Sequence, residues 1–264
     1  SGMMGQDTLS DRQRDILALI EADGAQYIEQ LAARYAVTTQ TVRRDINALC
    51  DLGYARRFHG GVDAPVTVRN ISINARATLN SGAKQRIARR IAADIEPGST
   101  VFMGIGSTVQ FVAEALRSRD NLRVVTNNID VALALCNAPE VEVHMTPGLL
   151  RHNDRDVVGS DSLAFFEKFY ATHAVVGAGA LDPEKGILDF SYAEAQTTTT
   201  LIANSRVQYL AADMSKWTRD ASVRVATFSR ITSFYTDRLP VDRLASAALQ
   251  AAGTNVVLCG QDTD

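Results

Sequence analysis

Two pairs of arginines near the start of this 264-residue chain are the first residues whose type and spacing suit binding chemistry. Arg43 and Arg44 form one pair, and Arg56 and Arg57 form the other. Guanidinium groups bind phosphates and base edges, which are the two features of DNA that proteins contact. The whole chain has a formal net charge of −3, which argues against indiscriminate binding to nucleic acid. The arginines would therefore have to form a local basic surface.

The first arginine pair lies in a segment with the pattern of a helix. Thr38 is a suitable N-cap, because its hydroxyl can accept a hydrogen bond from an amide of the first turn. At about 100° per residue, Val42, Ile46 and Leu49 fall on one face of this helix. The polar residues on the other faces are Gln40, Arg43, Arg44 and Asn47. If this segment stood alone, a solvated helix face would be the preferred interpretation.

The neighbouring segments favour a DNA-binding domain. Residues 27–35 form a short amphipathic helix, and residues 36–38 form a tight connection, which together give the spacing of a helix-turn-helix. Gly53 ends the second helix, and residues 56–61 (RRFHGG) suit a β-wing that lies along a phosphate backbone. Ser10 begins a capping-box pattern, which predicts a further helix packed behind these two.

The sequences TVRRDI over residues 41–46 and RRFHGG over residues 56–61 resemble the winged helix of the DeoR family of bacterial transcription regulators. This resemblance implies that double-stranded operator DNA is a partner of the chain. The residues that we expect to contact DNA are Thr39, Gln40, Thr41, Arg43, Arg44, Asn47, Arg56, Arg57 and His59.

Apolar strands and helices alternate in the rest of the chain, from about residue 83. The predicted strands cover residues 100–103, 122–126, 141–145, 174–177, 207–212, 231–235 and 255–258. Such alternation predicts a mainly parallel sheet with helices on both faces. We therefore predict an α/β protein with a winged helix-turn-helix domain over residues 8–62, a linker over residues 63–80 and a larger domain over residues 81–260.

Two strand-to-helix corners of the larger domain could bind an anion. Residues 104–108 (GIGST) follow one predicted strand, and residues 126–128 (TNN) follow the next one. Small residues and a helix N-terminus let backbone amides approach a phosphate, and hydroxyls add further donors. Lys84 could supply a full positive charge. Tight packing is the alternative explanation of the glycines, and solvation is the alternative for the lysine.

Two further clusters could bind the rest of a ligand. Asp213 and Lys216 follow a predicted strand and should lie at an edge of the sheet rather than in the interior of a helix. Tyr192 and Glu194 lie where a loop enters a helix. Carboxylates suit sugar or polyol hydroxyls, and lysine suits phosphate. A local ion pair between Asp213 and Lys216 is the alternative.

Residues 84 to about 235 resemble the sugar-phosphate-sensing domain of the same family, which has a ribose-5-phosphate-isomerase-like fold. The matching segments are residues 84–88 (KQRIA), 104–108 (GIGST), 124–128 (VVTNN), the turn at Gly177, and residues 213–216 (DMSK). The resemblance implies a transcriptional regulator, a repressor of a sugar or polyol catabolic operon, that is released by a phosphorylated effector such as glycerol-3-phosphate or a sugar phosphate. Presentation of two DNA-binding domains to repeated half-sites implies a homo-oligomer, a dimer or a tetramer.

By this resemblance the phosphate ligands would be Lys84, Ser107, Thr108, Thr126 and Asn127, and Gly106 would also belong to the effector site. The rest of the effector would be bound by Tyr192, Glu194, Asp213 and Lys216. The chain departs from the family pattern at Gly104, at Pro147 and around Thr172. Carboxylates are lost at the first and last of these places, which should change the hydroxyls that are recognised.

The segment GIGST also resembles a loop of ribose-5-phosphate isomerases, so an isomerase that carries a DNA-binding domain is the alternative function. That chemistry requires a carboxylate base and a group that stabilises an enediolate. The paired aspartates and the lysine-glycine run of that family are missing around residues 172–186, and Glu194 is the remaining candidate base. We therefore expect no catalytic site. A purely structural second domain is a third possibility, which the polar residues at the strand ends disfavour.

The remaining patterns exclude other classes of protein. Cys50, Cys136 and Cys259 lie among apolar neighbours and are odd in number, which predicts buried free thiols in a reducing cytoplasm. The histidines share no ligand spacing with these cysteines, so we expect no metal and no cofactor. No apolar run approaches the length of a membrane span, and no signal peptide is recognisable. We therefore expect a cytoplasmic protein with no membrane partner.

Overall fold

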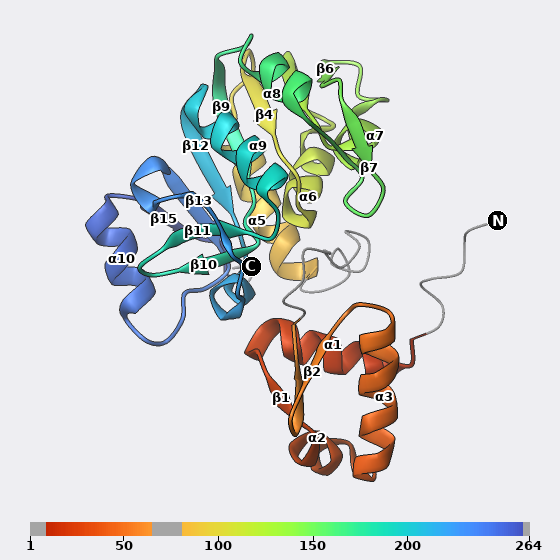
Figure 1. The fold of residues 1–264 in the computed structure, drawn as a ribbon. Helices are drawn as coiled ribbons and strands as arrows, with labels where there is room; N and C mark the ends of the chain where they lie inside the picture. Colours follow the sequence, from red (N-terminus) through yellow and green to blue (C-terminus); the bar gives the residue numbers. More distant parts are fainter. Residues whose placement is uncertain (1–8, 65–80, 261–264) are drawn as a thin grey trace, which may run out of the picture. The chain divides into compact units, whose positions relative to one another are not determined.

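A computed structural model describes residues 9–64 and 81–260 of the chain (Figure 1). The chain divides into two units, Ser1–Ile71 and Ser72–Asp264. The division falls inside the linker predicted over residues 63–80, of which residues 65–80 lie outside the described residues. The domain boundaries at residues 62 and 81 stay a prediction.

Three helices and a small antiparallel sheet form the first unit. The helices are α1 (Asp11–Asp23), α2 (Ile28–Tyr35) and α3 (Thr39–Asp51), and the strands are β1 (Gln26–Tyr27), β2 (Arg56–Phe58) and β3 (Gly61–Asp63). The strand order is β1-β3-β2. Ser10 caps α1 in the predicted capping box. The predicted winged helix-turn-helix is confirmed, with β2, β3 and their turn as the wing. The short strand β1 is an addition to it.

The sequence of α3 explains both its start and its packing. The Thr38 hydroxyl accepts a hydrogen bond from the Thr41 amide at 3.2 Å, as predicted for an N-cap. Val42, Ile46 and Leu49 are fully buried, so the apolar stripe packs into the core of the first unit. The arginine-bearing faces of α3 consequently remain at the surface.

The wing contains Gly61 because three strands meet there. A Cβ at this position would lie 2.5 Å from the carbonyl oxygen of Gln26 and 2.3 Å from the ring of Phe58. The Phe58 ring packs edge-on against Tyr27, with 5.7 Å between the ring centroids. The second glycine of the HGG motif therefore allows β1 and the wing to pack closely.

A seven-stranded sheet forms the centre of the second unit. Its strands are β4 (Thr100–Met103), β5 (Leu122–Thr126), β6 (Val141–Met145), β9 (Ala171–Val176), β12 (Ser205–Ala211), β14 (Ser233–Thr236) and β15 (Asn255–Leu258). The order is β15-β14-β12-β9-β4-β5-β6, and every neighbouring pair is parallel. The predicted parallel α/β domain is confirmed.

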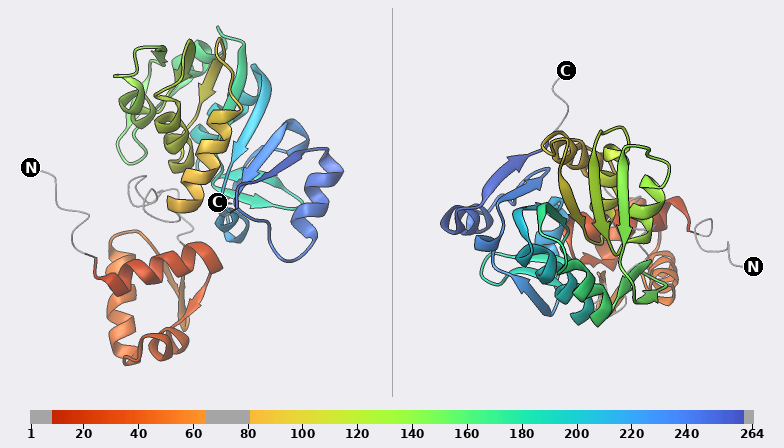
Figure 2. Two further views of the ribbon diagram at one scale, coloured as in Figure 1. Left: turned by 180° about the vertical axis from the view of Figure 1, so that it is seen from behind. Right: turned by 90° about the horizontal axis from the view of Figure 1, so that it is seen from above.

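Helices cover both faces of this sheet (Figures 1 and 2). One face packs against α5 (Ser81–Ala93), α6 (Ser107–Leu116) and α7 (Ile129–Leu135), and the other packs against α8 (Ser160–Phe166), α9 (Tyr192–Ala203) and α10 (Leu244–Ala252). Along β4, Val101 and Met103 belong to the first core and Phe102 belongs to the second. This alternation follows from the two-residue period of a strand.

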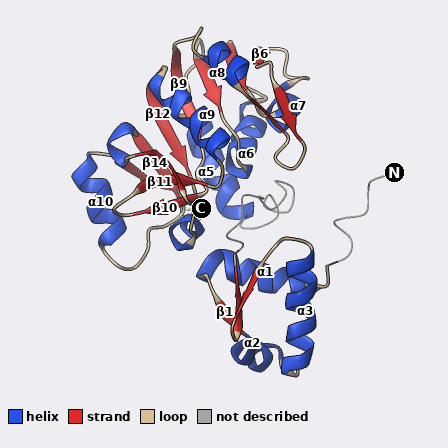
Figure 3. Ribbon diagram, in the orientation of Figure 1, coloured by secondary structure: helices blue, strands red, loops and turns tan. Residues whose placement is uncertain are grey.

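Short antiparallel strands add elements that the sequence analysis does not predict (Figure 3). A hairpin consists of β7 (Leu149–Arg151) and β8 (Asp156–Val158), and a three-stranded sheet consists of β10 (Ala180–Asp182), β11 (Gly186–Asp189) and β13 (Val223–Ala226). Strands of three or four residues are too short to show a clear hydrophobic period. Two 3₁₀ helices, η1 (Met214–Thr218) and η2 (Phe228–Arg230), complete the described elements.

Two predictions about single residues are wrong. Lys216 lies within the 3₁₀ helix η1, because the Asp213 carboxylate caps that helix by accepting from the Ser215 amide at 2.9 Å. All three cysteines are free, but Cys136 is exposed and Cys50 is half-buried, so Cys259 alone matches the predicted buried thiol.

In residues 9–64 and 81–260, no helix combines the length and apolar character of a membrane span.

Candidate functional site

Helix α3 and the wing present most of the predicted DNA-contact residues at the surface of the first unit. The exposed ones are Gln40, Arg43, Arg44, Asn47, Arg56, Arg57 and His59, and Thr39 and Thr41 are half-buried. A surface groove lies between α2, α3 and the wing turn, and Arg43, Thr39 and Gly60 are among its lining residues. Basic and amide side chains on two neighbouring elements are suited to phosphates and base edges.

The two wing arginines differ in their contacts. The Arg56 guanidinium lies 3.3 Å from the Asp63 carboxylate on β3 and donates to the Ala64 carbonyl oxygen at 3.1 Å. Arg56 therefore lies along the wing. Arg57 and His59 are exposed beside it, and so are placed to meet a partner more directly.

Asp45 fixes α3 against α1. Its carboxylate is buried on the helix and accepts from Arg12 Nε at 2.5 Å and from Gln13 Nε2 at 3.2 Å. In the sequence alone, Asp45 is a negative charge that partly offsets the positive charges of Arg43 and Arg44. In the structure Asp45 is buried whereas Arg43 and Arg44 are exposed, so its contacts with α1 help to set which faces of α3 reach the surface.

A cavity of the second unit lies at the carboxyl ends of β4, β9 and β12, which are neighbours in the sheet. The chain runs outward in one direction from β4 to β5 and β6, and in the other direction from β9 to β12, β14 and β15. The cavity therefore lies at the point where the strand order reverses, which is the usual ligand position in such sheets.

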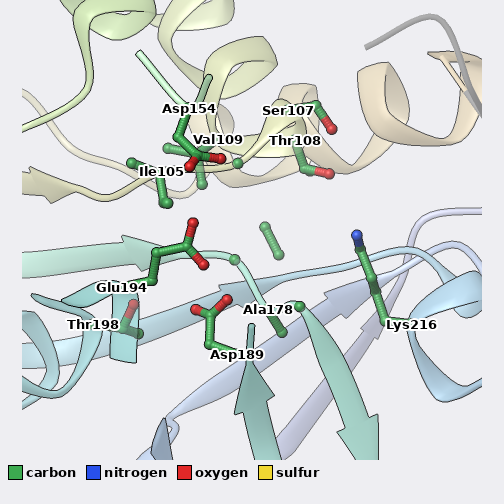
Figure 4. Close-up of a pocket in the computed structure, with 14 residues that line it drawn as sticks. Ile105, Ser107, Thr108, Val109, Asp154, Ala178, Asp189, Glu194, Thr198 and Lys216 are labelled. Atoms are coloured by element: carbon green, nitrogen blue, oxygen red, sulfur yellow. The ribbon is translucent and has the colours of Figure 1, made fainter. Parts of the chain in front are cut away.

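One end of this cavity is suited to an anion (Figure 4). Gly106, with φ of 130°, caps α6 and has no side chain to occupy the amides of the first turn. Ser107 and Thr108 begin that helix and are buried at the cavity wall. Lys216 of η1 approaches from the opposite wall. Helix amides, hydroxyls and an ammonium group together favour a phosphate.

The other end carries carboxylates from three elements. Asp154 comes from the β7–β8 turn, Asp189 from β11 and Glu194 from α9 (Figure 4). Burial raises the pKa of Glu194 well above its usual range, and the charge of Asp189 and a hydrogen bond with it act in the same direction. Arg151 opposes this rise, because its Nη2 lies 3.1 Å from Glu194 Oε1.

Several predicted effector-binding residues meet at this cavity and others do not. Those that line it are Gly106, Ser107, Thr108, Glu194 and Lys216. Asp213 lies behind it as the cap of η1. Lys84, Thr126, Asn127 and Tyr192 are not among the lining residues. Tyr192 is 69% exposed, whereas Lys84 is only 2% exposed and lies within the protein.

The corner after β5 has a structural role. The Thr126 hydroxyl donates to the Met103 carbonyl oxygen at 2.7 Å, which ties β5 to β4. The Asn127 amide donates to the Val157 carbonyl oxygen at 3.0 Å, and the Asn128 side chain caps α7. These side chains hold the corner and the hairpin together. Their predicted contact with phosphate is not supported by this arrangement.

Comparison with known proteins agrees with this architecture. Residues 12–68 match the model of the DeoR-like helix-turn-helix domain, and residues 79–238 match that of the DeoR C terminal sensor domain. The chain belongs to the DeoR family. The resemblance found in the sequence motifs is thereby confirmed.

Individual relatives span nearly the whole chain. The chain is 35% identical over 231 residues to the glycerol-3-phosphate regulon repressor of Escherichia coli (strain K12), which covers 88% of this chain and 92% of the relative. It is 34% identical over 255 residues to the HTH-type transcriptional repressor CsqR of the same organism, with 97% of both chains covered.

Among solved structures, ribose 5 phosphate isomerase A from Neisseria gonorrhoeae shows 17% identity and a TM-score of 0.36, with 51% of this chain and 52% of that chain covered.

Several residues that line the cavity of this DeoR-family chain are not predicted from the sequence. Asp154, Asp189 and Thr198 line the cavity, as do the small residues of the turn 177–179. Asp154 follows the short strand β7 and Asp189 is the last residue of β11, and neither strand is long enough to show a periodic signal. Of the turn 177–179, Gly177 belongs to the segments that carry the family resemblance.

The departures from the family pattern are accommodated by local structure. Thr172 stands in β9 and donates from its hydroxyl to the Thr100 carbonyl oxygen at 2.9 Å, so it supports strand pairing away from the cavity. Gly148, after Pro147, has φ of 142°, and a Cβ there would lie 2.5 Å from the Val158 carbonyl oxygen.

Among the described residues, no group of three or more His, Cys, Asp and Glu side chains is placed to hold a metal ion.

The contact between α1 and α3 predicts a coupled effect of two substitutions. Asp45→Ala should lower both the melting temperature of the protein and its affinity for operator DNA, because α3 loses its hold on Arg12. Arg12→Ala should have a similar effect, and the double variant should be little worse than either single one. Thermal unfolding and fluorescence anisotropy with operator DNA measure both quantities. Fully additive effects would contradict the coupling.

The environment of Glu194 predicts a dependence of stability on pH. A carboxyl whose pKa is raised by folding holds a proton that the unfolded chain releases, so the free energy of unfolding falls as pH rises from the ordinary glutamate pKa to the raised one. Glu194→Gln should make this fall shallower in urea unfolding followed across pH. Asp156, whose pKa burial also raises, should leave a remaining slope. Glu184→Gln, at an exposed turn position, is the matched control and should leave the slope unchanged.

Proposed function

We propose that this chain is a DNA-binding transcriptional repressor that a phosphorylated small molecule releases from its operator. Several of its relatives are named as repressors, among them a glycerol-3-phosphate regulon repressor and a lactose phosphotransferase system repressor. The observation that carries the proposal is the cavity at the reversal of strand order, in a chain that also has an arginine-bearing helix-turn-helix.

The effector's phosphate is proposed to bind at the Ser107, Thr108 and Lys216 end of the cavity. The amides of the first turn of α6 have no side-chain cap, and the partial positive charge of a helix N-terminus favours an anion. Lys216 is 8% exposed, and an ammonium group in a site of low dielectric attracts phosphate more strongly than one in water. Hydroxyl donors supply the remaining hydrogen bonds.

Control of DNA binding is proposed to work through a homo-oligomer. Two helix-turn-helix units must be presented together to two half-sites of an operator. An effector that favours another arrangement of the subunits then weakens operator binding. Reciprocity requires operator DNA to weaken effector binding by the same factor.

The isomerase alternative has less support. It depends on Glu194 as the base, yet the Glu194 carboxyl is in contact with Arg151 and hydrogen-bonded with Asp189. These partners occupy the carboxyl group that would have to remove a proton from the substrate. We therefore do not propose an enzymatic activity, and turnover of ribose 5-phosphate by the purified protein would contradict this view.

The exposed arginines of α3 provide the test of DNA binding. Arg43→Ala and Arg44→Ala should each lower operator affinity by at least about tenfold, because a base or phosphate contact is lost. Effector binding should be unchanged. Fluorescence anisotropy with promoter fragments from beside the gene measures the affinity, and Arg14→Ala on the exposed side of α1 is the matched control. Normal operator affinity in both α3 variants would show that another surface binds DNA.

A thermal-shift screen of phosphorylated sugars and polyols tests the cavity. A compound that binds the folded protein raises the melting temperature by mass action, and its dephosphorylated form should not. Lys216→Ala should lose both this shift and the release of operator DNA by the same compound, while it keeps operator binding. Lys185→Ala, at an exposed turn, is the matched control. An unchanged dose–response in Lys216→Ala would rule out its role at the phosphate.

A further inference from the structure

The turn of the β7–β8 hairpin buries a single carboxylate. His152 and Asn153 of this turn are exposed, whereas Asp154 is 6% exposed and lines the cavity. Burial of a carboxylate costs free energy unless charged or polar groups surround it. The turn thus places against the cavity a charged side chain that could otherwise have remained in water.

Arg151 holds the hairpin in this position. Its guanidinium forms two hydrogen bonds with Asp156, its register partner on β8, at 2.8 and 2.7 Å. It also lies 3.4 Å from Asp154 Oδ2 and 3.1 Å from Glu194 Oε1, and it donates to Ser191 Oγ at 3.2 Å. One side chain therefore joins both strands of the hairpin, its turn and the start of α9.

A second set of contacts fixes the other side of the hairpin. Arg155, with φ of 49°, forms an ion pair with Asp130 of α7 at 2.6 Å. The backbone of β8 donates from Val157 to the Asn127 carbonyl oxygen at 2.8 Å. The turn is thus held from two sides, and the direction of Asp154 follows from contacts outside the cavity.

The position of Asp154 within the cavity limits what it can bind. In Figure 4 it lies beside Ile105 and Val109, at the end where Glu194 and Asp189 also lie, and away from Lys216. A carboxylate repels a phosphate and accepts hydrogen bonds. The part of a ligand that meets Asp154 must therefore be a hydrogen-bond donor, and the phosphate must lie at the opposite end.

We propose that Asp154 accepts hydrogen bonds from hydroxyl groups of the effector beyond its phosphate, and that Arg151 is the positioning residue that keeps Asp154 against the cavity. The effector class is accordingly a phosphorylated polyol or sugar with hydroxyls at the carbon atoms away from the phosphate. This inference rests on the proposed function, since it takes the phosphate to bind beside Lys216.

The test separates recognition of hydroxyls from recognition of phosphate. Calorimetric titrations of the full-length protein use glycerol-3-phosphate, ribose 5-phosphate and glucose 6-phosphate, with propyl phosphate and inorganic phosphate as probes that lack the distal hydroxyls. At least one hydroxyl-bearing compound should bind the native protein about tenfold or more tightly than propyl phosphate, since hydrogen bonds to charged groups are the strong ones. Asp154→Ala should reduce this preference to within about twofold and leave the affinity for propyl phosphate unchanged.

The positioning role has its own readout. Arg151→Lys keeps a positive charge but loses the planar fork that bonds Asp156, so the preference for the hydroxyl-bearing compound should fall while binding of inorganic phosphate persists. A loss of protein stability alone would weaken the binding of all the ligands to the same extent. Asp161→Ala, which removes an exposed carboxylate on the neighbouring α8, should behave as the native protein. Operator binding by every variant without effector confirms that it is folded.

The outcomes distinguish this inference from the proposed function. An undiminished preference in Asp154→Ala overturns the role of Asp154 and leaves the repressor proposal intact. A native protein that binds propyl phosphate as tightly as every hydroxyl-bearing compound overturns the inference as well. A native protein that binds none of the phosphorylated probes overturns the proposed phosphate site, and this inference with it.

Discussion

The reversal of strand order between β4 and β9 is the constraint on which the second unit depends. Both strands are parallel and paired, yet the chain leaves their carboxyl ends in opposite directions along the sheet. The connections therefore separate above the sheet and leave a hollow between them. Gly177 allows the two corners to approach, because a Cβ there would already lie 3.3 Å from the Ile105 carbonyl oxygen. The start of α6 thereby faces a cavity.

This constraint explains which parts of the site could be predicted from the sequence. Periodic patterns identify the strands and the glycine-rich start of α6, and these depend on neighbours in sequence. The position of β9 beside β4 depends on pairing between distant segments and has no local signal. Without it, Thr126 and Asn127 are expected beside the phosphate, since their strand follows β4 in the chain. In the structure β5 is on the other side of β4 from the cavity.

The sequence predicts the role of a charged residue correctly where its side chain is exposed, and incorrectly where its side chain is buried. Arg43 and Arg44 are exposed as their helical positions predict. Asp45, between them and the apolar stripe, is only a negative charge in the sequence, but a tertiary contact to Arg12 turns it into a support for α3. The same holds for Asp154, whose three-residue flanking strands give no period and whose burial depends on Arg151.

A buried ion network is weak support for stability, because apolar residues of similar volume often stabilise a fold equally well. The network around Arg151 is better explained by geometry. Its guanidinium lies close to carboxylates from three elements: Asp156 of β8 at 2.7 Å, Asp154 of the hairpin turn at 3.4 Å and Glu194 near the start of α9 at 3.1 Å. A ligand that changes the hydrogen bonding of Asp154 or Glu194 must also change the contacts of Arg151, and through them the hairpin. An effector that makes few contacts can in this way alter the balance between two arrangements of a whole segment, which is what a regulatory equilibrium requires.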